Sequence, residues 1–188
     1  MSSDPLESRE VVVGVTGGIA AYKAAELVSR LRQRGAAVTV VMTVAATQFV
    51  RPLTFAALSG RRVITDLFEH PEHYEVDHVA LAQRADLAIA APATANLLAK
   101  LVTGIADDAL TTALVALACP IVLAPAMNAR MWANPVVESN VARLRERGCQ
   151  VVEPEEGWLA CGEKGAGRLA GVQTILAAAE AALATSPR

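Results

Sequence analysis

The sequence predicts an α/β fold of three layers, in which helices cover both faces of a doubly wound parallel sheet. Short aliphatic runs alternate with helical segments along the whole chain, which is the pattern of parallel sheets. The residues are 53% hydrophobic and only 4% aromatic, as expected for an aliphatic core between helices and a buried sheet. The length of 188 residues suits one domain, with residues 1–9 and 185–188 frayed.

The first half of the chain opens with a β-branched run at 11–15, which lacks polar alternation and predicts a strand buried on both faces. A glycine turn then leads into a helix that ends near Gln33, before Gly35. The next elements are expected to be a strand at 37–42, short helices at 45–50 and 52–58, and a third strand at 61–64.

The second half repeats this alternation. Asp77 is suited to cap a short helix, and the acidic pair at 107–108 suits the start of a helix at 109–118. The remaining expected elements are strands at 86–91, 119–124 and 150–153, a helix ending near Leu101, and helices at 135–147 and 172–183.

Composition and charge exclude several classes of partner. The net charge is −2 without a long basic run, so no nucleic-acid partner is expected. No apolar run is long enough to span a membrane, and residues 1–10 do not resemble a signal peptide. The three cysteines, Cys119, Cys149 and Cys161, lack CxxC spacing. We therefore expect no disulfide framework, no metal site and a cytoplasmic location.

A candidate anion site lies where the first strand ends. Gly17, Gly18 and Ile19 lead directly into a helix, and free N–H groups at a helix start attract phosphate. The spacing is neither GxGxxG nor a P-loop, so a structural turn and a phosphate cradle are equally good interpretations. Thr43, at the end of the second strand, is suited to cap a helix or to bind the same phosphate.

Two further strand ends carry candidate binding residues. The small residues Ala93 and Ala95, with Thr94 and Asn96, leave room for a flat ligand and offer hydrogen bonds. Asn128 can hold a carboxylate without titrating, beside an apolar wall of Met127, Met131 and Trp132. Ordinary helix caps and core contacts are the competing interpretation for both groups.

His78 and Cys161 are the candidate reactive residues. His78, at the start of a helix, can relay a proton near neutral pH, although capping or packing is the better explanation of its position alone. Cys161 lies in a glycine-rich segment that predicts a mobile loop. A thiol in such a loop is either a reactive group on a flap or an incidental cysteine.

Together these segments resemble the flavin-dependent cysteine decarboxylases, and most closely the phosphopantothenoylcysteine decarboxylases. They span nearly the whole chain in the family's order. The matching segments are Gly14-Val-Thr-Gly-Gly-Ile-Ala-Ala-Tyr-Lys23, Asp77-His78, Pro92-Ala-Thr-Ala-Asn96 with Gly104-Ile-Ala-Asp-Asp108, Pro125-Ala-Met-Asn-Ala-Arg-Met-Trp132, and Ala160-Cys-Gly162.

The resemblance implies a flavodoxin-like fold that binds FMN. It implies a phosphate site at Gly17, Gly18 and Ile19 with further contacts from Thr43, and an isoalloxazine ring near Ala93, Thr94, Ala95 and Asn96. It also implies that His78 is a base or proton relay and that Cys161 is the proton donor. Asn128 would bind the substrate carboxylate, with Met127 and Ala160 as further substrate contacts.

The implied reaction oxidises the substrate thiol to a thioaldehyde, decarboxylates it to an enethiol and reduces the enethiol with reduced FMN. Family members are trimers or dodecamers made of trimers, with shared active sites, and we expect the ligase of the pathway on a separate chain. A peptidyl-cysteine decarboxylase, a flavin prenyltransferase and a non-catalytic FMN-binding regulator are the alternatives. The chain departs from many relatives at Ala166 and Leu169, which bears on the fit of the substrate loop.

Overall fold

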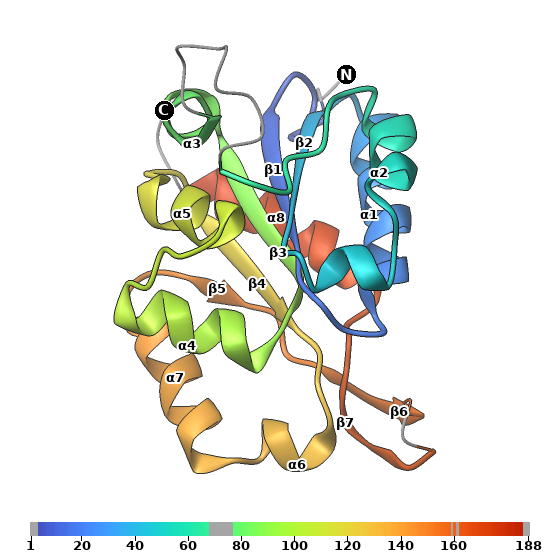
Figure 1. The fold of residues 1–188 in the computed structure, drawn as a ribbon, viewed down its shortest axis with the longest axis vertical. Helices are drawn as coiled ribbons and strands as arrows, with labels where there is room; N and C mark the ends of the chain where they lie inside the picture. The colour runs from blue at the N-terminus through green and yellow to red at the C-terminus, as the bar shows by residue number, and fades with distance from the viewer. Residues whose placement is uncertain (1–3, 68–76, 159, 161, 186–188) are drawn as a thin grey trace.

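The computed structural model describes residues 4–67, 77–158, 160 and 162–185. Its central sheet has the strand order β2-β1-β3-β4-β5, and every pairing in it is parallel (Figure 1). This is the flavodoxin-like order, so the expected fold class is confirmed. The strands are β1 Glu10–Val15, β2 Ala37–Met42, β3 Leu87–Ala93, β4 Ile121–Pro125 and β5 Gln150–Val151.

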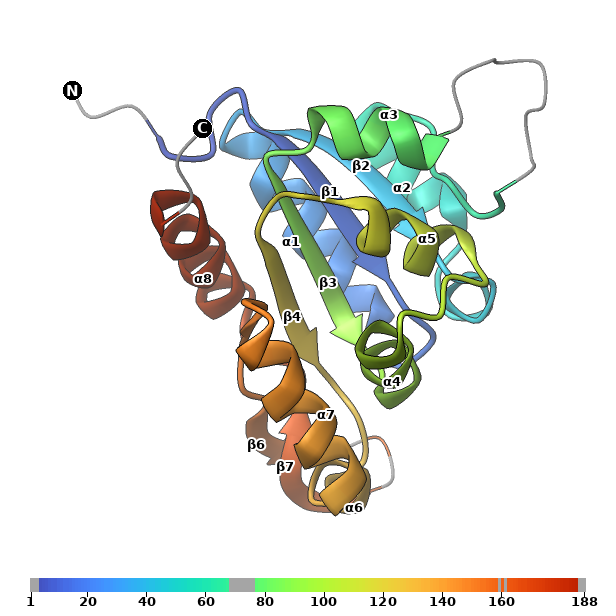
Figure 2. The same ribbon diagram turned by 90° about the vertical axis from the view of Figure 1, so that its left-hand side faces the viewer.

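Helices cover both faces of this sheet and give the three layers (Figure 2). Each face of the sheet has its own hydrophobic core, and the side chains of β1 alternate between them. Val11, Val13 and Val15 pack on the side of α1 and α8, whereas Val12 packs on the side of α5. The helices are α1 Ala21–Gln33, α2 Pro52–Ser59, α3 Asp77–Arg84, α4 Ala95–Thr103, α5 Ala109–Ala116, α6 Ala129–Trp132, α7 Pro135–Glu146 and α8 Val172–Thr185. A single 3₁₀ turn, Ala46–Gln48, replaces the helix expected over 45–50.

The strand expected at 61–64 is not a strand. Only Ile64 pairs with β2, through an isolated bridge to Val41, in which the Ile64 N–H donates to the Val40 carbonyl at 2.9 Å. The segment after α2 thus contributes one residue to the sheet edge. Arg61 forms an ion pair with Glu10 of β1 at 2.6 Å.

The glycine-rich segment around Cys161 also differs from expectation. Its flanks form an antiparallel hairpin of β6 Glu155–Trp158 and β7 Lys164–Arg168 instead of a loop without regular structure. The hairpin extends beyond the central sheet and lies against α6 (Figure 1). Glycine suits this hairpin because β7 passes very close to another backbone segment, as described below.

Residues 4–9 are held in place, which corrects the expectation of a frayed end over 1–9. Leu6 is fully buried in the core. Arg34, after the end of α1, forms ion pairs with Asp4 at 2.7 Å and with Glu180 of α8. The start of the described chain is therefore fixed to the first and last helices.

Asp108 caps the start of α5, whereas the sequence had suggested it as an acidic residue of the first turn. Its carboxylate accepts a hydrogen bond from the Thr111 N–H at 2.8 Å, and the Thr111 hydroxyl accepts one from the Asp108 N–H, which completes a capping box. Burial on its own would raise the pKa of Asp108, but the bonds from Thr111 and from Lys100 outweigh it and lower this pKa below its usual value.

Among the residues that the structure describes, no helix has the length and apolar character needed to cross a membrane.

Candidate functional site

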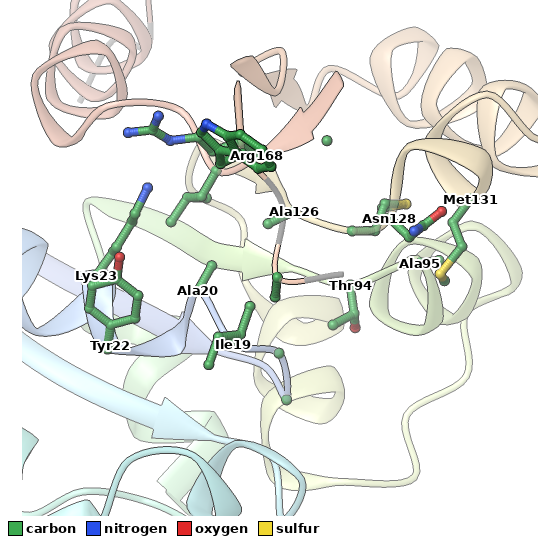
Figure 3. Close-up of a pocket in the computed structure, with 17 residues that line it drawn as sticks. Ile19, Ala20, Tyr22, Lys23, Thr94, Ala95, Ala126, Asn128, Met131 and Arg168 are labelled. Atoms are coloured by element: carbon green, nitrogen blue, oxygen red, sulfur yellow. The ribbon is translucent and has the colours of Figure 1, made fainter. Parts of the chain in front are cut away.

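A cavity of about 650 Å³ opens at the carboxyl ends of β1, β3 and β4. In an open α/β sheet this is the edge at which ligands bind, at the point where the chain reverses its direction of winding. Figure 3 shows side chains from α1, α4 and the β4–α6 segment facing the cavity. It is lined by Gly17, Gly18, Ile19, Ala20, Tyr22, Lys23, Thr94, Ala95, Ala126, Met127, Asn128, Met131, Trp158, Ala160, Gly167, Arg168 and Leu169.

The glycine turn forms one wall of this cavity and leads into α1. A methyl group on Gly17 would lie 2.4 Å from the Ala45 Cβ, so the turn packs directly against the segment after β2. The first turn of α1 contains no acidic residue, and Ala20 at the N-cap offers no side-chain acceptor to its N–H groups. This helix end is thus available to an external anion.

The floor of the cavity is positioned by Thr16, which is only 2% exposed. Its hydroxyl donates to the Pro92 carbonyl at 2.7 Å and accepts a hydrogen bond from the Thr94 N–H at 3.1 Å. Thr94 in turn caps α4 by accepting from the Leu97 N–H at 3.4 Å. A single buried hydroxyl thereby joins the end of β1 to the residue that begins α4.

Replacing Thr16 by valine is expected to lower the free energy of unfolding by about 1–3 kcal/mol, because it leaves a buried carbonyl and a buried N–H unpaired at the cavity floor. Chemical denaturation measures this change. Thr103→Val is the matched control, since the exposed Thr103 hydroxyl bonds only to helix carbonyls and its loss should cost under about 0.5 kcal/mol. Equal stabilities of the two variants would contradict the bridging role.

A second cavity of about 440 Å³ lies beside the first, and Gly17, Thr94, Ala95 and Met131 line both. Thr43 and Asn96, which were predicted to contact the cofactor, line this second cavity. The Thr43 hydroxyl also accepts a hydrogen bond from the Ala46 N–H at 3.2 Å. Thr43 thus bonds to the first residue of the 3₁₀ turn, whose N-cap is Ala45. Phosphate binding by Thr43 stays a prediction.

Ala93 differs from the other predicted cofactor contacts. It is fully buried within β3 and lines neither of these two cavities. Its carbonyl accepts a hydrogen bond from the Ala126 N–H at 3.2 Å. On the described geometry Ala93 therefore holds the β4 end in place, and the cavity wall begins at Thr94.

Asn128 and Met127 line the large cavity opposite the glycine turn. The Asn128 side chain caps α6 by accepting a hydrogen bond from the Arg130 N–H at 2.8 Å. The adjacent Met127 N–H donates to the Gly167 carbonyl at 2.9 Å, and this bond attaches β7 to the site. The capping function of Asn128 is thus observed, and its role toward a carboxylate remains a prediction.

The apolar wall is only partly as predicted. Met131 and Met127 line the cavity, but Trp132 packs against the core beneath α4 and α7. Leu169 lines the cavity while being 2% exposed, and Ala160 lies at its edge as expected.

The two predicted reactive residues are not positioned by the described geometry. Cys161 lies outside the described residues, and for His78 the structure gives only its place as the second residue of α3. Cys119 and Cys149 are half-buried against the core and line neither of the two cavities. Burial raises the pKa of Cys119 to about 11 and also raises that of Cys149, which confirms the packing role expected for both.

Several lining residues had no role assigned from the sequence, and the ones with large side chains are Tyr22, Lys23, Trp158 and Arg168. A local signal existed for Lys23, because a positive charge in the first turn of a helix opposes the helix dipole. Trp158 and Arg168 carried no such signal, since their position depends on the hairpin. Trp158 is 74% exposed at the edge of the cavity.

Residues 1–183 match the Flavoprotein family. The chain is 49% identical over 175 residues to the coenzyme A biosynthesis bifunctional protein CoaBC of Bacillus subtilis (strain 168), covering 93% of this chain and 43% of that protein. The chain therefore spans less than half the length of this curated relative.

Solved structures agree with this match. The structure of SpaF, described as an FMN-dependent cysteine decarboxylase, superposes with a TM-score of 0.84 at 37% identity, covering 96% of this chain and 99% of that one. A PPC decarboxylase variant complexed with pantothenoylaminoethenethiol superposes with a TM-score of 0.82 at 29% identity, covering 91% of this chain and 96% of that one.

Proposed function

The chain belongs to the Flavoprotein family, and from that premise we propose that it is an FMN-dependent carbon–carbon lyase, a phosphopantothenoylcysteine decarboxylase. It would convert 4′-phosphopantothenoylcysteine to 4′-phosphopantetheine in coenzyme A biosynthesis. The observation that carries this proposal is the large cavity, which has a glycine turn without acidic residues on one wall and Asn128 with Met127 on the other.

The described residues fit FMN. A phosphate fits the turn at Gly17 and Gly18, where α1 begins without an internal acceptor, with Thr43 on the adjoining wall. Thr94, Ala95 and Asn96 leave a flat, small-residue surface for the ring beside Met131. When bound, FMN supplies the two-electron chemistry that makes the cysteine carboxylate a leaving group.

The protein residues would orient the substrate and move its protons. The Asn128 amide can bind the cysteine carboxylate without competing for its charge, and Met127 and Ala160 would contact the adjacent substrate atoms. His78 would act as base or proton relay, and Cys161 would donate the proton of the final reductive step. The apolar wall of Met131 and Leu169 would limit water at the reacting carbon.

The test is to purify the protein, record its flavin absorbance and incubate it with phosphopantothenoylcysteine. We expect a yellow protein that releases carbon dioxide and forms phosphopantetheine. Cys161→Ser should keep its flavin and release carbon dioxide but accumulate the oxidised enethiol product, because the last proton donor is missing. Cys119→Ser is the control and should form phosphopantetheine. A colourless protein without product contradicts the proposal, and a full phosphopantetheine yield from Cys161→Ser removes that residue from its role.

A second candidate is decarboxylation of a cysteine in another substrate, such as the end of a peptide. The higher identity to SpaF, 37% against 29% for the PPC decarboxylase variant, favours keeping it. Incubation with a peptide ending in cysteine distinguishes the two, since only this candidate predicts release of carbon dioxide from the peptide.

We further propose a cytoplasmic homotrimer, or a dodecamer made of trimers, with the ligase activity on a separate chain. Exposed apolar side chains support self-association: Val44, which lines the second cavity, is 68% exposed, and Leu53 of α2 is 77% exposed. Light scattering of the purified protein measures the oligomer.

A further inference from the structure

Two positive side chains lie together at one end of the large cavity. Lys23 extends from the first turn of α1, and Arg168 extends from the last residue of β7. In Figure 3 both lie on one side of the cavity, whereas Asn128 and Met131 lie on the other. The two groups come from segments 145 positions apart in the sequence, so only the folded chain brings them together.

No internal anion neutralises this pair. Within residues 4–67, 77–158, 160 and 162–185, neither the Lys23 ammonium nor the Arg168 guanidinium has a hydrogen bond or an ion pair. Two carboxylates, those of Glu155 and Glu26, act on Lys23 through charge alone. Glu155 already accepts a hydrogen bond from the Gly171 N–H at 2.7 Å, and Glu26 forms an ion pair with Arg30 at 3.7 Å. Every other charge cluster described above, such as Arg34 with Asp4 and Glu180, is paired.

The surroundings of Lys23 make this arrangement unfavourable without a ligand. Burial lowers the pKa of Lys23, and the positive charge of Arg168 lowers it further. Arg168 is held near Lys23 because its side chain crosses Gly157, where a methyl group would lie 2.9 Å from the Arg168 Cδ. Lys23 also stands at the positive end of the α1 dipole. A cation that is partly buried, close to a second cation and at the positive end of a helix dipole is locally unfavourable, and such unfavourable arrangements are characteristic of binding sites.

We propose that Lys23 and Arg168 form the subsite that binds the terminal phosphate monoester of the substrate. This inference rests on the proposed function, whose substrate carries an anion at each end. With the cysteine carboxylate at Asn128, the phosphate reaches the opposite end of the cavity, where the two cations lie (Figure 3). Arg168 suits a phosphate because its guanidinium can donate two parallel hydrogen bonds.

The cofactor phosphate is a different anion and has a different place. The second cavity, lined by Gly17, Thr43 and Ala45, includes neither Lys23 nor Arg168. The glycine turn and Thr43 therefore suit the cofactor phosphate, and the pair at the far end of the large cavity remains for the substrate. This separation predicts that removing the pair changes substrate preference and leaves flavin content unchanged.

The test uses the FMN-loaded protein and calorimetric titration with 4′-phosphopantothenate and with pantothenate, neither of which can be decarboxylated. The measured quantity is the ratio of the two dissociation constants. Lys23→Gln should lower the preference for the phosphorylated ligand by about 10-fold, and Arg168→Gln by about 5-fold because it is more exposed. Arg30→Gln, at the other end of α1, removes the same charge and should keep the wild-type ratio. Added salt should also reduce the preference.

The outcomes separate this proposal from the proposed function. Variants that keep the wild-type ratio, or that lose flavin absorbance instead, overturn the subsite. Decarboxylation that proceeds equally well with and without the phosphate also overturns it, while the decarboxylase function stands. A wild-type protein that selects 4′-phosphopantothenate through Lys23 but does not decarboxylate phosphopantothenoylcysteine supports the subsite and contradicts the function.

Discussion

Asn128→Asp is expected to lower kcat/KM for phosphopantothenoylcysteine by about 100-fold or more, with little change in stability. Aspartate caps helices as well as asparagine does, so the bond to the Arg130 N–H should persist. The substitution nevertheless replaces the donating amide nitrogen by a charged oxygen. A substrate carboxylate at that position would then face a like charge in a partly enclosed cavity, which costs several kcal/mol.

Asn134→Asp is a closely matched control for this change. Asn134 caps α7 in the same way, by accepting a hydrogen bond from the Val136 N–H at 2.9 Å, and it does not line either described cavity. Steady-state rates of carbon dioxide release should fall only in the Asn128 variant. If Asn128→Asp matches the wild type, Asn128 does not bind the carboxylate. If both variants lose activity equally, the loss comes from the caps.

Gly167→Ala is expected to lower the free energy of unfolding by about 3 kcal/mol or more and to abolish decarboxylation. A methyl group at this position would lie 2.2 Å from the Met127 carbonyl oxygen, a backbone atom that cannot rotate away. The φ of +134° is also unfavourable for any other residue. The hairpin would have to move off Met127, which removes Arg168 and Leu169 from the cavity wall.

Gly148→Ala is the control that separates the cost of a positive φ from the cost of the contact with the Met127 carbonyl. Gly148 also has a positive φ, +87°, but an added methyl group would meet nothing within 4 Å. Its replacement should cost about 1 kcal/mol and leave activity intact. Denaturant titration gives the two stabilities, and equal values would show that contact with Met127 is not the cause. An active Gly167→Ala protein would show that the hairpin can form the site from another position.

The fold was predictable because most elements carry their own local pattern. β1 and β2 are rich in β-branched residues, and Gly35 follows α1 with a left-handed backbone conformation. The strand expected at 61–64 carried a similar apolar signal in Val63 and Ile64. Only Ile64 pairs with β2, so an apolar signal of two residues was too short to predict a strand.

The site was predictable where a residue follows a strand directly and not where it depends on the hairpin. Thr94 comes immediately after β3, and Asn128 is the third residue after β4, so the common sheet edge brings them together. Arg168 and Trp158 reach the cavity through β6 and β7, which the glycine content obscured. Ala93 lies within β3 and is buried, because β3 extends two positions further than the apolar run predicted, and its contact with a cofactor stays a prediction.

The single backbone bond between Met127 and Gly167 also has a consequence for biosynthesis of the protein. The glycine turn and α4 are made early, but the far wall of the cavity arrives only with β7, near the end of the described chain. A ribosome-bound chain that ends at Ala126 would carry the turn and lack the residues that enclose a ligand. Enclosure of the substrate end of the cavity therefore requires that synthesis has passed Leu169 and that the hairpin has docked.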